Sequence, residues 1–167
     1  MVIHEKRVIE APADRRIVLT RLFDASKEQL FEAWTKPWHV SEWWGPNGST
    51  TTIREMDVTP SGLWRFVMRG PDGVDHRNTV VYIEVVSTNR LVFASSRDDA
   101  RPGTRPYHVT VVFNEQGGQT QVTVRTLYNS IAERDAKLKA GAIREGIQTL
   151  ARLARYLPRM SRPESVN

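Results

Sequence analysis

SIAERDAKLKAGAIREGIQTLARLARYL, residues 130–157, is the only long segment of the chain with a clear helical period. Its apolar residues recur at spacings of four and three, which places them on one helix face: Ile143, Ile147, Leu150, Ala154 and Leu157, widened by Leu153. A polar face carries Arg144, Gln148, Arg152, Arg155 and Arg159. The pattern predicts a single amphipathic helix of roughly 25 residues, about 35–40 Å long.

The segment before this helix is predicted to consist mostly of short strands. Alternating apolar residues and intervening turns place the strands at 16–23, 50–58, 63–69, 78–86, 90–95, 107–113 and 119–128. Short turns between the later strands favour an antiparallel meander. A helix of this length must bury its apolar face against something large, and the strands are the only candidate. The sequence therefore predicts an α+β fold in which a curved antiparallel sheet of about seven strands grips a long C-terminal helix and leaves a cavity between them.

Two short helices are expected between the first and second of these strands. Ser26 is a candidate N-cap, and Gln29 stands three residues later, where a capping-box partner belongs. Pro37 suits the first turn of a second helix that runs through Trp44. The turn residues Gly45-Pro46-Asn47-Gly48 then end that helix.

The composition is that of a basic globular protein of one domain, with 167 residues, a net charge of +5 and no cysteine. The lack of cysteine excludes disulfides, thiolate nucleophiles and cysteine metal ligands. The basic residues are scattered in the sequence, so nucleic-acid binding is not expected. No apolar run approaches the roughly 18 residues of a membrane helix, and the start of the chain does not resemble a secretory signal. These features predict a cytoplasmic protein without membrane association.

The sequence contains none of the familiar motifs for phosphate loops, dinucleotide sites, zinc proteases or serine hydrolases. The histidines are His4, His39, His76 and His108, and no two of them have the spacing of helical metal ligands. His39 and Glu42 are three residues apart and offer at most two ligands, so a solvated pair is the favoured interpretation. We expect no metal, no cofactor and no defined catalytic residues.

Aromatic residues are the candidates for lining the cavity. Of the adjacent Trp43 and Trp44, one is expected to anchor the helix pair and the other to lie at the cavity mouth. Trp64, Phe66 and Met68 share one strand face, which serves either a pocket or plain sheet core.

The predicted central strand at 78–86 places Tyr82 and Glu84 on one face. A carboxylate there must be exposed or paired, because burying it alone is costly. Glu84 is therefore expected either to face solvent or to orient a ligand or pair with Arg65 or Arg125.

An ordered set of short motifs spans most of the chain, from about residue 17 to residue 157. It comprises Arg21-Leu22-Phe23-Asp24-Ala25-Ser26, Ala33-Trp34-Thr35, Trp43-Trp44-Gly45-Pro46, Gly62-Leu63-Trp64-Arg65-Phe66, Tyr82-Ile83-Glu84-Val85, Arg90-Leu91-Val92-Phe93, Gly141-Ala142-Ile143-Arg144-Glu145-Gly146 and Leu150-Ala151-Arg152-Leu153. Together these motifs resemble the bacterial proteins related to the activator of the 90-kDa heat-shock-protein ATPase, within the SRPBCC (START-like, Bet v 1-like) superfamily. Where relatives often have His-Gly after the motif ending in Phe93, this chain has Ala94-Ser95.

The resemblance implies a helix-grip fold of seven antiparallel strands, with two short helices closing one end of a mostly apolar cavity. It implies binding of a small hydrophobic or aromatic molecule, without fixing one activity. The residues expected to line the cavity are Trp44, Trp64, Phe66, Met68, Tyr82, Glu84, Phe93, Val109, Val111, Ile143, Ile147 and Leu150.

Two other functions stay open at this stage. An enzyme of the cyclase, dehydratase or hydrolase type would use Glu84, Tyr82, His76 or His108. A co-chaperone or stress-response protein would present the basic face at Arg144, Arg152, Arg155 and Arg159. A chaperone partner or a second copy of the chain, in a homodimer, is therefore a further candidate partner.

The expected domain organisation is simple. We expect a lead at residues 1–15, a single domain at 16–157 and a tail at 158–167.

Overall fold

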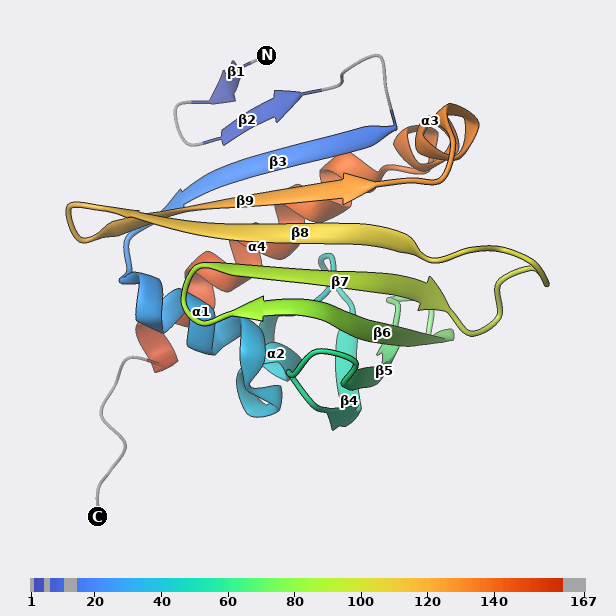
Figure 1. The fold of residues 1–167 in the computed structure, drawn as a ribbon, viewed down its shortest axis with the longest axis horizontal. Coiled ribbons are helices and arrows are strands. Elements are labelled where there is room, and N and C mark those ends of the chain that lie inside the picture. Colours follow the sequence, from blue (N-terminus) through green and yellow to red (C-terminus); the bar gives the residue numbers. More distant parts are fainter. Residues whose placement is uncertain (1, 5–6, 11–14, 161–167) are drawn as a thin grey trace.

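The computed structural model describes residues 2–4, 7–10 and 15–160, and the outer parts of the expected lead and tail lie outside these ranges. Its described elements are strands and four helices (Figure 1). The strands are β1 (Val2–His4), β2 (Arg7–Glu10), β3 (Arg16–Phe23), β4 (Thr50–Met56), β5 (Leu63–Arg69), β6 (Asp75–Val86), β7 (Arg90–Arg97), β8 (Tyr107–Gln116) and β9 (Gln119–Leu127). The helices are α1 (Lys27–Thr35), α2 (Pro37–Trp43), α3 (Ile131–Lys139) and α4 (Ala142–Met160).

The strands form one antiparallel sheet in the order β1-β2-β3-β9-β8-β7-β6-β5-β4. The seven strands β3 to β9 are the curved sheet that the sequence predicts, and the meander from β4 to β9 is confirmed. Strands β1 and β2 extend this sheet past β3 with residues of the expected lead. Helix α4 runs across the concave face of the sheet, and α3 lies near the end of β9, where the chain leaves the sheet (Figure 1).

Helices α1 and α2 carry the chain from β3 to β4, at the far edge of the seven-stranded sheet. The Ser26 hydroxyl accepts a hydrogen bond from the Gln29 N–H at 3.1 Å, so the predicted N-cap is confirmed. Pro37 occupies the first turn of α2, as predicted, because a proline there loses no helical hydrogen bond.

The prediction of one continuous C-terminal helix is wrong. Helix α3 ends at Lys139, α4 begins at Ala142, and Gly141 between them adopts a φ of +96°. This left-handed conformation favours glycine and turns the chain out of the helical path. Helix α4 also runs past Pro158 to Met160, beyond the predicted end at Leu157.

The core lies between the concave face of the sheet and the helices. Helix α4 buries Leu150, Leu153 and Leu157 there. Near its start, Gly146 packs so closely that a side chain at this position would meet the Leu19 side chain of β3. The described helices include none that is long and apolar enough to cross a membrane.

Candidate functional site

A groove opens between one end of the concave sheet face and the helices α3 and α4. Its volume is about 580 Å³. Its lining comes from the sheet, from the loop after β7 and from both helices: Met68, Asn78, Ser95, Ser96, Arg97, Asp99, Ala100, Thr104, Arg105, Tyr107, Glu133, Lys137 and Glu145. We call this site the grip groove.

The floor of the grip groove is made by four adjacent strands. Ser95 of β7 lies directly opposite Tyr107 of β8, and both share the sheet face of the core residue Val80 of β6. Asn78 lies opposite Phe66, two residues from Met68 on β5. Because residues directly opposite in adjacent strands point to one face, these side chains lie together under the helices.

The loop between β7 and β8 forms one wall and is held against the start of α3. The Asn129 side-chain amide donates hydrogen bonds to the carbonyl oxygens of Arg105 and Pro106, at 3.0 and 3.1 Å. On the helix side, the Lys137 ammonium lies 5.8 Å from the centre of the Tyr107 ring, within the range of a cation–π contact. The loop wall is thus held at the start of α3, and α3 in turn contacts the floor through Lys137 and Tyr107.

The rim of the grip groove is charged. The Arg97 guanidinium donates to both carboxylate oxygens of Asp99, at 3.1 and 3.0 Å, and this contact lowers the pKa of Asp99. The same guanidinium lies 2.8 Å from Nδ1 of His76, and that nitrogen accepts the bond. A polar rim around Met68 and Tyr107 suits a ligand with both apolar and polar parts.

Most of the twelve sequence-predicted lining residues lie in or against the core. Seven are buried: Trp64, Phe66, Tyr82, Phe93, Val109, Val111 and Leu150. Four more are partly buried and pack against that core: Trp44, Met68, Ile143 and Ile147. Met68 also lines the grip groove. Contact of these residues with a ligand stays a prediction.

Glu84 lies apart from the other predicted residues. A β-bulge falls between Tyr82 and Glu84, so the expectation that they share a face is wrong. Tyr82 is buried, whereas the Glu84 side chain is 42% exposed and accepts a hydrogen bond from Arg90 at 2.8 Å. Glu84 therefore faces solvent as an ordinary surface ion pair, with a partner that the sequence did not indicate.

Of the adjacent tryptophans, Trp43 is fully buried and Trp44 only partly, and Trp44 is not among the residues that line the grip groove. The position of Trp44 at a cavity mouth stays a prediction. Rings in this region contact one another closely. Trp44 lies 5.0 Å from Trp64, and Trp64 stacks on Phe66 at 4.6 Å between ring centres. Aromatic side chains thus fill the interior behind the floor of the grip groove.

Sequence reasoning missed most of the grip groove. The departure at Ala94-Ser95 was its one available signal, because Ser95 lies in the floor. Among the residues weighed for catalysis, Tyr82 is in the core, His108 is exposed and His76 contacts the Arg97 of the rim. The described residues contain no group of three or more histidine, aspartate or glutamate side chains that could hold a metal ion.

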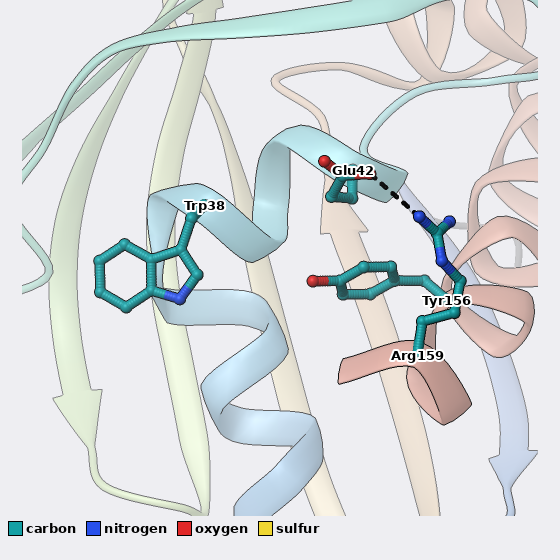
Figure 2. A pocket seen from close by; sticks show the side chains of 4 residues that line it. All are labelled: Trp38, Glu42, Tyr156 and Arg159. Carbon is teal, nitrogen blue, oxygen red and sulfur yellow. Dashed lines mark ion pairs between the residues drawn. The ribbon is translucent and has the colours of Figure 1, made fainter. Parts of the chain in front are cut away.

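A shallower depression of about 400 Å³ lies between α2 and the end of α4, lined by Trp38, Glu42, Tyr156 and Arg159 (Figure 2). The Arg159 guanidinium approaches the Glu42 carboxylate at 3.9 Å (Figure 2). His39, which the sequence paired with Glu42 in solvent, is instead buried and bonds to Tyr156 and Glu32. That expectation is therefore wrong.

The predicted basic face of the last helix is not one continuous solvated surface. Arg144, Arg155 and Arg159 are exposed. Arg152 is partly buried and donates to the carbonyl oxygens of Gly45 and Pro46, at 2.9 and 3.0 Å. Burial, reinforced by the charge of Arg155, lowers the pKa of Arg152. Arg152 thus fixes α4 to the turn after α2.

The curved antiparallel sheet, the two short closing helices and the groove beside the last helix define a helix-grip protein of the SRPBCC type, a fold that commonly binds hydrophobic ligands. The chain belongs to the family of Activator of Hsp90 ATPase homolog 1-like proteins, whose model matches residues 24–158. This confirms the family that the sequence motifs indicated.

Solved bacterial structures share the fold. Protein Ms6760 from Mycobacterium smegmatis is 19% identical with a TM-score of 0.82, over 90% of this chain and 95% of that one. A protein from Arthrobacter aurescens is 17% identical with a TM-score of 0.84, over 96% and 98%. A Rhodobacter sphaeroides protein is 24% identical with a TM-score of 0.82, over 92% and 99%. A search of curated proteins found no match.

Proposed function

We propose that the grip groove binds a small molecule that combines an apolar or aromatic part with polar substituents, and that the protein binds it without a chemical step. The observation that carries this proposal is the groove itself, about 580 Å³ between the sheet and the helices. That volume lies within the roughly 300–1,000 Å³ of small-molecule sites. The family's fold supports the same function.

The lining defines how such a ligand would lie. Met68 and Tyr107 offer apolar surface at the floor, and Met68 adapts its shape to different ligands. The Asn78 amide and the Ser95 hydroxyl lie beside them as hydrogen-bonding groups. A purely hydrocarbon ligand would cover these polar groups and the charged rim without forming hydrogen bonds to them, so the ligand class is narrower than hydrophobic molecules in general.

The packed rings behind the floor favour the grip groove over a deeper cavity. A ligand among Trp44, Trp64 and Phe66 would have to separate rings whose centres lie 4.6–5.0 Å apart. Such pairs contribute about 0.5–1.5 kcal/mol each beyond their burial. We therefore place the ligand at the groove mouth, on Met68, rather than inside the core.

The test is a thermal-shift screen of aromatic acids, phenols, flavonoids and fatty acids against the full chain. A ligand at 100 times its Kd stabilises the folded state by about 2.7 kcal/mol, which corresponds to a rise in Tm of roughly 5–10 °C for a protein of this size. The binding site is then mapped by amide chemical shifts in NMR. The proposal expects the largest shifts at Ser95, Thr104 and Tyr107.

The variant Thr104→Trp fills the groove from its exposed loop wall, and Thr52→Trp on the exposed edge strand β4 is the matched control. Titration calorimetry should show at least about tenfold weaker binding in Thr104→Trp and unchanged binding in Thr52→Trp. Equal affinity in both variants, or shifts centred on Trp64 and Phe66, would contradict the grip groove as the site. Conversion of the ligand on incubation would contradict binding without chemistry.

A further inference from the structure

A second large depression lies on the opposite, convex face of the sheet. It has a volume of about 570 Å³ and is bounded by the first turn of α1, the turn between β6 and β7, and strands β8 and β9. Its polar and charged lining side chains are Lys27, Asn89, Arg90, Asn114, Gln121, Thr123 and Arg125. We call it the basic depression. It shares no lining residue with the grip groove.

All charged side chains that line the basic depression are positive: Lys27, Arg90 and Arg125. Within the described part of the chain, the Arg125 side chain has no ion-pair or hydrogen-bond partner. Lys27 donates to the neutral Asn89 amide oxygen at 2.6 Å. Glu84 outside the depression engages one nitrogen of Arg90, and the other nitrogens of that guanidinium are left for a ligand. The cluster therefore has an uncompensated positive charge.

The strand register holds these groups around one point. Arg90 of β7, Val112 of β8 and Thr123 of β9 lie directly opposite one another and so share the convex face. Arg125 follows two residues after Thr123 on the same face. Arg90 and Arg125 are two strands apart and offset by two residues along the strands, so their Cα atoms are roughly 12 Å apart. Two arginine side chains at that separation can contact one anion from opposite sides.

The fourth side of the depression is fixed by a contact between distant segments. The hydrogen bond from Lys27 to Asn89 ties the start of α1 to the turn between β6 and β7. Arg90 follows Asn89 directly and lines the depression together with Asn89 and Lys27. A bound anion would be attracted by the positive charges that line the depression.

We propose that the basic depression binds the phosphate of a small phosphorylated molecule, with Lys27, Arg90 and Arg125 contacting the phosphate oxygens. Guanidinium groups match phosphate geometry with paired hydrogen bonds, and an ammonium adds a point charge. The depression is larger than one phosphate requires. Asn114 and Gln121, which lie opposite each other across β8 and β9, offer amide donors and acceptors to the rest of the molecule.

The test uses the full chain and four ligands: inorganic phosphate, AMP, ATP and adenosine. Titration calorimetry should show binding of AMP and ATP, weaker binding of inorganic phosphate and none of adenosine, because the phosphate supplies the charge contacts. The double variant Lys27→Gln/Arg125→Gln should weaken AMP binding at least about tenfold. It removes charge-assisted hydrogen bonds to the phosphate, which are stronger than hydrogen bonds between neutral groups. Amide shifts on AMP addition should centre on Gln121 and Thr123.

The control variant Lys139→Gln/Arg155→Gln removes the same charge from exposed positions on α3 and α4. It should bind AMP as the unmodified chain does. Equal weakening in both double variants would show general attraction to a basic protein and overturn the proposal. Failure of both AMP and ATP to bind would overturn it as well. Because the grip groove is on the other face, its ligand should bind equally well to the Lys27→Gln/Arg125→Gln variant.

Discussion

The Tyr156 hydroxyl lies 2.6 Å from Nδ1 of His39, and this contact joins the last helix to the second short helix. On its other side, Nε2 of His39 lies 3.4 Å from the Glu32 carboxylate. A neutral His39 satisfies both contacts when Tyr156 donates to Nδ1 and Nε2–H donates to Glu32. Because His39 is buried and Glu32 is half exposed, this chain of three residues connects α1, α2 and α4 from the interior to the surface.

We expect Tyr156→Phe to destabilise the protein by about 1–3 kcal/mol, because it leaves a buried ring nitrogen of His39 without its partner. Urea unfolding measures the loss. Tyr107→Phe is the matched control, since Tyr107 is partly buried and the structure shows no hydrogen bond of its hydroxyl among the described residues. A Tyr156→Phe protein as stable as the control would show that the contact with His39 adds nothing.

The variant Arg152→Met is expected to lower the free energy of unfolding by about 1–3 kcal/mol. It keeps much of the apolar stem but removes the hydrogen bonds to the Gly45 and Pro46 carbonyls. Arg155→Met, at an exposed position of the same helix, should change stability by less than about 0.5 kcal/mol. Denaturant midpoints of the two variants decide this, and equal effects would mean that Arg152 is an ordinary surface residue.

The parts of the fold that follow from local chemistry could be predicted from the sequence. Ser26 caps its helix and Pro37 begins the next one because capping and proline geometry depend on a few neighbouring residues. The alternation of Trp64 and Phe66 likewise gave the buried face of β5. Such features survive folding because tertiary contacts reinforce the local preference.

The break in the C-terminal helix was missed although a signal exists. Lys137 and Lys139 stand in the last turn of α3, and Gly141 follows at the position where glycine ends helices. The continuous apolar pattern from Ile143 to Leu157 favours one long helix and is stronger than this signal. The pattern describes only α4, because α3 buries little of its surface and has a single buried residue, Arg134.

The candidate site was less accessible to prediction than the fold. Periodicity identifies residues that point inward, such as Tyr82 and Phe93, but it does not show which inward residues leave space between them. The grip groove depends on where the loop containing Thr104 and the helix containing Lys137 come to lie, which is set by contacts far apart in sequence. The bulge that turns Glu84 outward is a comparable case, because one extra residue in a strand exchanges its faces.

Replacement of Gly141 tests the role of the helix break. Gly141→Ala places a side chain at a φ of +96° and should cost about 1–2 kcal/mol in stability. Gly141→Asn should cost less, because asparagine tolerates positive φ better than other residues. Circular dichroism and urea unfolding follow both variants. Equal losses in the two variants would show that backbone conformation is not the cause.

Stability should fall at alkaline pH because of three tyrosines. Burial raises the pKa of Tyr82, Tyr128 and Tyr156 above the ordinary value of 10.0. In the unfolded chain these phenols lose their protons near pH 10, whereas in the folded protein they keep them. The unfolded state therefore binds fewer protons, so their contribution to stability is complete below about pH 10 and is lost as the pH rises through the folded-state pKa values.

The measurement is a pair of pH titrations, one of tyrosinate absorbance and one of the urea midpoint. We expect the absorbance change of Tyr82, Tyr128 and Tyr156 to accompany unfolding rather than precede it, and Tyr128→Phe to reduce the slope of stability against pH. The variant removes one shifted phenol and leaves the other two in place. Ionisation of all four tyrosines near pH 10 in a protein that stays folded would contradict the raised pKa values of Tyr82, Tyr128 and Tyr156.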